Sequence, residues 1–240
     1  MTTQFEEIDF QETPLGDISL RRRTDPLLGG KLLFEIKLGD EFLMSSLFTE
    51  AEIQLAKLGL AALDEDHWDI VVGGLGLGYT AAAVLDDPSV RSLSVIEIMK
   101  PIIDWHRQGL VPLGSRLTAD SRCHLVQADF FQWVSSSGGF DQIDPSRLIH
   151  ALLLDIDHSP TVWLHPENRM FYTTAGIRSM AEKLLPGGVF GLWSNDPPDD
   201  EFVQLLRTVF QFCDANIVSF PNPYLGGEST NTVYIARKHR

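Results

Sequence analysis

The chain has 240 residues, of which 44% are hydrophobic, and its formal net charge is −14. Length and composition are those of a folded globular protein, one large α/β domain or one domain with a small appendage, and they exclude a disordered chain. The negative charge would repel a phosphate backbone, so we expect no nucleic-acid partner. Because no apolar run reaches membrane-spanning length and the N-terminus lacks a signal-peptide pattern, we expect no membrane association and a cytoplasmic protein.

Short alternating segments separated by turn signals fill residues 5–45. The segments "DISLRRR", "KLLFEIKL" and "DEFLMSS" each have the pattern of a β-strand. The basic run at 21–23 is expected to be a solvated strand end. We therefore predict a small antiparallel β region over residues 1–48, followed by an α/β domain over residues 49–240.

A helix is predicted from about residue 50, where the pattern changes. In "TEAEIQLAKLGLAAL" the apolar residues Ile53, Ala56 and Leu60 recur at helical spacing. Thr49 is the expected N-cap, and Glu52 three residues later would complete a capping box. The segment thus predicts a helix with a well-defined start.

Strand and helix patterns alternate along the rest of the chain. The apolar runs "DIVVGG", "SLSVIE", "CHLVQA" and "HALLLD" are separated by helix-like stretches, the layout of a parallel sheet with crossover helices on both faces. Later, a helix stopped by Pro-Gly-Gly precedes another strand and helix, and "CDANIVSF" and "TNTVYIARK" form a hairpin. We predict an α/β, Rossmann-like, doubly wound and mostly parallel sheet that ends in an antiparallel hairpin. Cys123 and Cys213 lie in apolar strands and are expected to be reduced thiols.

The glycine-rich turn "GGLGLG" is the first indication of a ligand. Side chains at Gly74, Gly76 and Gly78 would keep a bound molecule away from the backbone at the carboxyl end of the strand. A dinucleotide fingerprint would need a small residue in place of Tyr79, which argues against an NAD-dependent oxidoreductase and for a ligand without a pyrophosphate. Tight helix–strand packing is the alternative explanation for the glycines.

Two acidic residues follow the next two strands. Glu97 ends "SLSVIE", where a carboxylate can accept hydrogen bonds from both hydroxyls of a ribose. Asp129 follows "CHLVQA" and can accept a bond from an adenine amino group, with Phe130 or Phe131 against the ring. The alternatives are a solvated strand end for Glu97 and an N-cap of "FFQWVSS" for Asp129. Together these residues predict a nucleoside site.

The fourth strand ends in "HALLLDIDHSP", where we expect the chemistry. Asp155 should point into the cleft beside the nucleoside and take a proton from an amine, because a protonated amine has no lone pair with which to attack carbon. Asp157 and His158 follow directly as further candidate catalytic residues. The alternative for Asp155 is to cap the loop through backbone amides.

A metal site is a weaker interpretation of the same segment. His158, Asp157 and His165 match no standard ligand spacing, so we expect no metal. Trp163 and Tyr172 are candidates for an apolar wall around the acceptor, with core packing as the alternative.

These motifs resemble the spermidine synthase (polyamine aminopropyltransferase) group of the class I S-adenosylmethionine-dependent methyltransferase fold. The resemblance covers nearly the whole chain and rests on "DEF", "GGLGLG", "SVIEI", "QAD", "LLLDIDHSP" and "FYTTAGIRSMAEKLLPGGVF". It implies that Glu97 binds the ribose, Asp129 lies by the adenine and Asp155 activates the acceptor amine. It also implies S-adenosylmethionine or its decarboxylated form as co-substrate, and a homodimer paired through the N-terminal sheet.

Several positions depart from the family pattern. Gly76 stands where the family has an aspartate that meets the amino tail of decarboxylated S-adenosylmethionine. Met44 and Ser45 replace a tyrosine and a polar partner that line the substrate groove. His158 replaces a second aspartate, for which Asp157 can substitute. Losing a charged partner costs about 1.5 to 3 kcal/mol, which argues against ordinary spermidine synthesis.

The sequence therefore predicts a spermidine synthase-like transferase that alkylates a small amine-like acceptor by aminopropyl or methyl transfer. In both reactions a nucleophile attacks a carbon attached to a sulfonium, and the protein contributes positioning and deprotonation. Two alternatives stay open. One is an S-adenosylmethionine-dependent methyltransferase with a non-polyamine acceptor, and the other is a nucleoside-binding protein without catalysis.

Overall fold

The structure is a computed structural model that describes residues 4–64, 66–136, 138–140, 144 and 146–240. The strands are β1 (Phe5–Thr13), β2 (Gly16–Asp25), β3 (Lys31–Leu38), β4 (Glu41–Ser45), β5 (Trp68–Gly73), β6 (Val90–Glu97), β7 (Cys123–Gln127), β8 (Ile149–Leu154), β9 (Leu184–Ser194), β10 (Phe212–Pro221) and β11 (Glu228–Arg237). The helices are α1 (Glu50–Ala61), α2 (Tyr79–Leu85), α3 (Lys100–Arg107), α4 (Gly114–Ala119), α5 (Phe130–Ser135), α6 (Thr174–Ala181) and α7 (Asp200–Arg207), with short 3₁₀ helices η1 (Pro26–Leu28) and η2 (Pro166–Met170).

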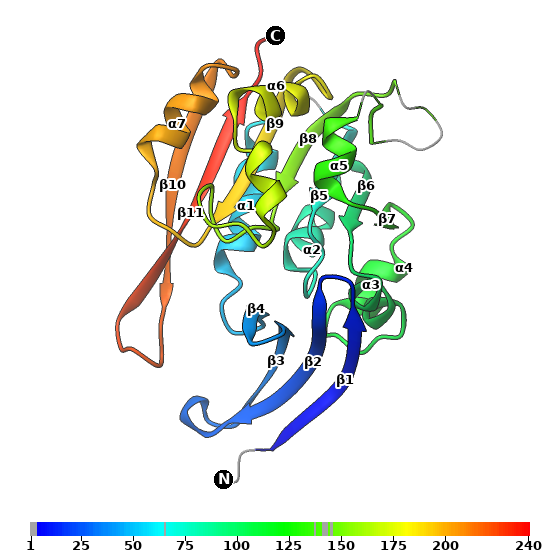
Figure 1. The fold of residues 1–240 in the computed structure, drawn as a ribbon, viewed down its shortest axis with the longest axis vertical. Coiled ribbons are helices and arrows are strands. Elements are labelled where there is room, and N and C mark those ends of the chain that lie inside the picture. Colours follow the sequence, from blue (N-terminus) through cyan, green and yellow to red (C-terminus); the bar gives the residue numbers. More distant parts are fainter. Residues whose placement is uncertain (1–3, 65, 137, 141–143, 145) are drawn as a thin grey trace.

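The first four strands form an antiparallel sheet in the order β1-β2-β3-β4, which lies below the larger sheet in Figure 1. The basic run at 21–23 sits in the middle of β2, so the prediction of a strand end is wrong. Each arginine is ion-paired with carboxylates of the same sheet, which accounts for three adjacent positive charges there. The pairs are Arg21–Glu7, Arg22–Glu6, Arg23–Asp25 and Arg23–Glu35.

The larger sheet has seven strands in the order β10-β11-β9-β8-β5-β6-β7. The strands from β5 to β9 run parallel, whereas β11 is antiparallel to both β9 and β10. Neighbouring residues of β5 belong to separate apolar clusters, Val71 to one and Ile70 and Val72 to the other, because a strand turns alternate side chains to opposite faces. The predicted mostly parallel α/β sheet with a C-terminal antiparallel hairpin is confirmed. The Pro-Gly-Gly segment lies inside β9 rather than at the end of the preceding helix.

Helix α1 begins at Glu50, next to the predicted N-cap Thr49, but its start differs from a capping box. The Thr49 side chain makes no capping bond, and the Thr49 amide donates to the Glu50 carboxylate over 3.0 Å. Glu52 is buried, with 7% of its surface exposed. The capping-box prediction is therefore wrong, because the helix turns Glu52 inward instead of back toward its own first residue.

The order of the central strands brings two connections together. The chain leaves β5 toward β6 on one side, and β8 pairs with β5 on the other, so the loops after β5 and β8 meet at the point where the strand order reverses. The Asp155 amide donates to the carbonyl of Gly73 over 2.8 Å. Ligands of open α/β sheets bind at this point.

The C-terminal hairpin links the two sheets. In Figure 1 the β10–β11 hairpin extends from the large sheet toward the N-terminal sheet. Near its tip, the Tyr224 hydroxyl donates to Asp25 Oδ2 over 2.6 Å and accepts a bond from Arg23. The structure thus has two sheets joined at one side, and the division at residue 48 stays a prediction. Within the described residues, no helix is long and apolar enough to cross a membrane.

Candidate active site

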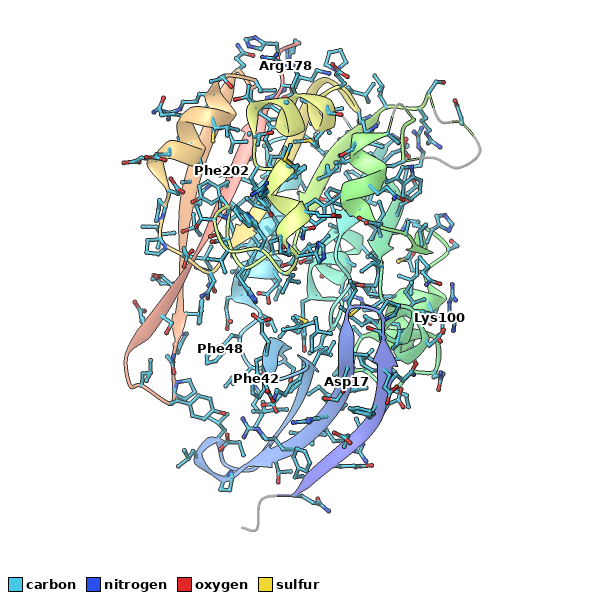
Figure 2. All side chains as sticks on the ribbon, viewed as in Figure 1. Asp17, Phe42, Phe48, Lys100, Arg178 and Phe202 are labelled. Atoms are coloured by element: carbon cyan, nitrogen blue, oxygen red, sulfur yellow. The ribbon has the colours of Figure 1, made fainter. Side chains whose placement is uncertain are left out.

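A cavity of about 1280 Å³ lies between the two sheets. Residues from β3 and β4, from α1, from the loops after β5, β6, β7 and β8, and from the β10–β11 hairpin line it. Two of them, Phe42 and Phe48, are labelled in Figure 2, where their side chains lie at the junction of the sheets. Pockets for one small ligand usually measure about 300 to 1000 Å³, so this cavity has room for two small molecules.

The three predicted glycines all have positive φ angles, 93° at Gly74, 47° at Gly76 and 92° at Gly78. A Cβ atom on Gly74 would overlap the backbone oxygen of Asp155, and one on Gly76 would lie 2.5 Å from the Met44 sulfur. Gly74 and Gly76 line the cavity. Gly78 instead faces Leu117, at 2.7 Å from a built Cβ, which is the tight packing that the sequence left as the alternative.

The conformation of the glycine turn is held from two sides. His106 is fully buried, and its Nε2 atom lies 2.9 Å from the Gly76 carbonyl oxygen, to which it donates. Burial lowers the pKa of His106, so the imidazole is neutral. On the cavity side, the Leu77 amide donates to the Met44 sulfur over 2.8 Å. Met44 therefore occupies the space that a side chain at position 76 would need.

Glu97 ends β6 at the cavity, with 8% of its surface exposed. Its carboxylate accepts hydrogen bonds from the amides of Leu75, over 3.1 Å, and Met99, over 2.8 Å. Burial raises the pKa of Glu97, and these backbone bonds act in the opposite direction. Ile98, which the sequence analysis did not select, is 41% exposed and lines the cavity as an apolar surface beside the carboxylate.

Asp129 and Phe130 start helix α5. One Asp129 oxygen accepts from the amides of Phe131 and Gln132, over 2.9 and 3.1 Å, so the N-cap alternative is what the structure shows. Asp129 also lines the cavity, which leaves its second oxygen for the predicted adenine contact. Phe130 is 2% exposed, packs among core aromatic rings and is one of the residues that line the cavity. Its contact with an adenine ring stays a prediction.

Asp155 follows β8 directly and lines the cavity. Its Oδ2 atom accepts a hydrogen bond from the Thr80 hydroxyl over 2.8 Å, rather than from backbone amides of its own loop. Burial raises the pKa of Asp155 to about 6, and the Thr80 bond lowers it. A carboxylate with this pKa is ionised at neutral pH and basic enough to accept a proton from a bound amine.

Asp157 occupies a different environment from the one predicted. It is 1% exposed and is not among the residues that line the cavity. Its carboxylate accepts from the Leu164 amide and the Asn168 amide group, both over 2.8 Å, and from the Tyr172 hydroxyl over 2.9 Å. Burial raises its pKa, and these bonds lower it. Asp157 therefore holds its loop in place through three hydrogen bonds. This position does not match the predicted catalytic role.

His158 lines the cavity and joins the two parts of the chain. Its Nε2 atom lies 2.7 Å from Glu41 of β4, the glutamate of the "DEF" motif. The other residues of the weaker metal interpretation are separately engaged, since His165 caps η2 and Asp157 anchors its loop. In the described part of the chain, no three His, Cys, Asp or Glu side chains gather as metal ligands.

The two aromatic residues proposed for the acceptor wall lie elsewhere. Tyr172 is 8% exposed, belongs to a core cluster and donates to Asp157. Trp163 donates through its indole to the Pro160 carbonyl over 2.9 Å. Neither is among the cavity-lining residues, so the prediction of an acceptor wall does not fit the structure. Trp193, which the sequence analysis did not select, lines the cavity, and its buried indole nitrogen has no partner among the described residues.

Comparison with known proteins gives a consistent result. No family model matches the chain. It is 28% identical over 175 residues to polyamine aminopropyltransferase 2 of Pseudomonas aeruginosa, a match that covers 69% of this chain and 45% of that protein. It is 24% identical over 226 residues to the polyamine aminopropyltransferase of Sulfolobus acidocaldarius, covering 90% of this chain and 66% of that protein. The chain therefore spans about half to two thirds of the length of these relatives.

Solved structures show the same fold. A spermidine synthase in complex with the transition-state analogue AdoDATO superimposes with a TM-score of 0.73 at 18% identity, over 97% of this chain and 73% of that one. The spermidine synthase of Thermotoga maritima gives 0.73 at 16% identity, over 97% and 72%. Human methyltransferase-like protein 13, in complex with SAH, gives 0.52 at 18% identity, over 80% and 79%. The resemblance of this chain to the spermidine synthase-like group of the class I S-adenosylmethionine-dependent methyltransferase fold is thus confirmed.

Proposed function

We propose that the protein is a transferase that alkylates a small amine, with S-adenosylmethionine or its decarboxylated form as co-substrate. One observation carries this proposal. Asp155, whose pKa is raised to about 6, faces the same cavity as the glycine turn and Glu97, at the reversal point of the strand order. A base and a nucleoside-type site thus share one space large enough for donor and acceptor together.

The residues of the site fit such a co-substrate. Gly74 and Gly76 line the cavity and carry no side chain, so a ligand can approach their backbone except where Met44 packs beside Gly76. Glu97 would hold the ribose, Asp129 the adenine amino group, and Ile98 offers apolar surface to the ring. When bound, the sulfonium supplies an electrophilic carbon.

The protein's part in the reaction is positioning and proton transfer. Asp155 accepts a proton from the acceptor ammonium, and Thr80 fixes the orientation of its carboxylate. The freed nitrogen lone pair then forms the bond to carbon, while the electron pair of the breaking carbon–sulfur bond stays on sulfur. Because the leaving group is a neutral thioether, no acid is needed on that side.

The shape of the cavity alone does not distinguish aminopropyl transfer from methyl transfer. Two observations bear on this choice. Both curated relatives are named as polyamine aminopropyltransferases, which supports aminopropyl transfer. Met44 fills the space beside Gly76 where the family's aspartate would meet the aminopropyl amine, which supports methyl transfer. Aminopropyl transfer to a polyamine-type amine is the first hypothesis, and methyl transfer to another amine is the second.

Isothermal titration calorimetry with S-adenosylmethionine, decarboxylated S-adenosylmethionine and methylthioadenosine tests this proposal. We expect all three to bind, and the tighter of the two sulfonium compounds identifies the transferred group. The double variant Met44→Ala, Gly76→Asp sharpens the result, because it clears the space beside position 76 and adds a carboxylate there, which should improve the affinity for the decarboxylated form about tenfold relative to S-adenosylmethionine. Absence of binding by all three compounds would refute the nucleoside site.

We also propose a cytoplasmic homodimer that binds no nucleic acid. Exposed aromatic residues on the N-terminal sheet, Phe5 at 57% and Phe10 at 50%, support pairing through that sheet. The net charge of −14 supports the absence of nucleic-acid binding, and the free thiols of Cys123 and Cys213 suit a reducing compartment. Sedimentation equilibrium with the wild type and a Phe5→Ser, Phe10→Ser variant tests the dimer.

A further inference from the structure

The described structure contains a buried carboxylate at the site to which no role has been given. Glu52 lies in the first turn of α1, which follows β4 and the N-terminal sheet (Figure 1). Only 7% of its surface is exposed, and it lines the same cavity as Asp155. Ala51 and Leu55 beside it are also buried, whereas Glu50 of the same turn is exposed, so the burial of Glu52 follows from the face of the helix on which it lies.

Helical spacing explains how Glu52 reaches the reaction side of the sheet. Glu52, Leu55 and Gly59 lie on one face of α1, which packs on β8 through Gly59 and on β9 through Leu55. A Cβ atom on Gly59 would lie 2.6 Å from the side chain of Leu153 in β8. Glu52 is two turns nearer the helix start than Gly59, and Asp155 follows two residues after Leu153. This packing places Glu52 near the carboxyl end of β8, where the negative charge of Asp155 raises the pKa of Glu52.

Glu52 lacks the partners that the other cavity carboxylates have. In the described part of the chain, no other residue donates a hydrogen bond to it, whereas Glu35 is paired with Arg23 and Glu97 accepts from two amides. The charged and titratable groups around it are Asp155 after β8, Tyr79 at the start of α2 and Glu50 on its own helix. None of them is positive, so nothing here compensates a buried negative charge.

The protonation of the pair follows from this environment. Burial and the neighbouring Asp155 raise the pKa of Glu52 to about 8, while that of Asp155 is raised to about 6. At pH 7 the pair therefore shares a proton, which lies more on Glu52 because burial and Asp155 raise its pKa further. An ammonium group placed between the two carboxyls would favour the ionised form of both.

We infer that Glu52 and Asp155 together bind the reacting amine of the acceptor as an ammonium, and that this binding expels the proton of Glu52 into solution. The inference rests on the proposed function and specifies the acceptor further. The nitrogen that reacts must be basic enough to arrive charged, as in an aliphatic amine, so hydroxyl, thiol and amide acceptors do not fit. Glu52 then keeps hold of the ammonium while Asp155 removes one of its protons for the transfer.

Calorimetry with 1,4-diaminobutane and 1-aminobutane as probes tests this, using protein saturated with methylthioadenosine at pH 7. Titrations in two buffers of different ionisation enthalpy give the number of protons released. For the wild type we expect release of about one proton per amine bound. Glu52→Gln should release close to none and bind the amine about tenfold more weakly or worse. Glu50→Gln removes an exposed carboxylate of the same helix turn, whose charge is the smallest of the causes that raise the pKa of Glu52, so it should release nearly as many protons as the wild type.

The outcomes separate this inference from the proposed function. Equal affinity and equal proton release in the wild type and Glu52→Gln would overturn the inference and leave the transferase intact. Failure of the wild type to bind either amine, with methylthioadenosine still bound, would overturn both the amine acceptor and the inference. Tight binding of Mg²⁺ with proton release, without amine binding, would overturn the inference in favour of a metal-cation site.

Infrared difference spectra supply a check without substrate, because a protonated carboxyl band should be present in the wild type at pH 7 and lost in Glu52→Gln.

Discussion

The carboxylates on the two sides of the cavity differ in the hydrogen bonds that they accept from the protein. On the side of the glycine turn, Glu97 and Asp129 each accept hydrogen bonds from two backbone amides. On the side of α1 and β8, Asp155 accepts one bond, from the Thr80 hydroxyl, and Glu52 accepts none from another residue in the described structure. The first pair is therefore fixed by the fold itself, whereas the second pair has unused capacity for a cation.

This difference has a consequence for what each side can do. A carboxylate held by amides is oriented before a ligand arrives, so a neutral nucleoside can bind to it without reorganising the protein. Two carboxyls close together in a buried place share a proton until a positive charge enters. In the proposed function, the side of Glu97 and Asp129 would recognise the nucleoside, and the Glu52–Asp155 side would exchange protons with a charged substrate.

The largest effect that would test this contrast is expected from Asp155→Asn. The amide keeps the shape and can still accept from Thr80, but it cannot take a proton from the acceptor. The turnover number should fall about 10²- to 10⁴-fold, as for the loss of a general base. Binding of methylthioadenosine, measured by calorimetry, should stay within about twofold of the wild type.

A rate for Asp155→Asn close to that of the wild type would show that another group removes the proton. The wild-type kcat/KM for the amine should also rise with pH around 6, because Asp155 acts in its ionised form and burial raises its pKa to about 6 in the free protein. That rise should disappear in the variant.

Glu97→Gln probes the opposite side, with a smaller effect. The substituted side chain keeps one acceptor oxygen, and its new amide nitrogen would face the amide of Leu75 or Met99, donor against donor. Losing a charge-assisted bond costs about 1.5 to 3 kcal/mol, so methylthioadenosine should bind about 10- to 100-fold more weakly. The Michaelis constant for the amine should change much less, and a change of similar size in both would mean that the two sides are not separate.

Features that depend on neighbouring residues in the sequence were predictable, whereas features that depend on contacts between distant residues were not. The strands and helices of the large sheet were predictable because apolar periodicity is a local signal, and the glycine turn and Asp155 were predictable because each directly follows an apolar strand. The structural role of Asp157 was not predictable, because its partners Asn168 and Tyr172 come 11 and 15 residues later in the chain. The sequence does not show the path of the loop that brings them back to Asp157.

Glu52 illustrates a second limit. Its spacing from Thr49 is that of a capping box, and its spacing from Leu55 and Gly59 is that of a buried helix face, so one position satisfies two patterns. Only the packing of α1 on β8 decides between them. An acidic residue on the apolar face of a predicted helix was the available signal, because burial of a charge there requires a partner or a function.

The last test concerns stability, and it examines the protonation of Glu52 without any ligand. The pKa of Glu52 is raised from its usual 4.5 to about 8 by burial and by Asp155, so the folded protein binds more protons than the unfolded chain between these values. The free energy of unfolding should therefore decrease as the pH rises from about 5 to about 8. Glu52→Gln cannot ionise, so its stability relative to the wild type should increase over this range by about 2 to 4 kcal/mol. Urea denaturation at several pH values measures both, with Glu50→Gln as the matched control, whose stability should fall with pH nearly as steeply as that of the wild type. Parallel curves for Glu52→Gln and the wild type would instead mean that Glu52 is ionised at pH 7 and that the two sides of the cavity hold their carboxylates in the same state.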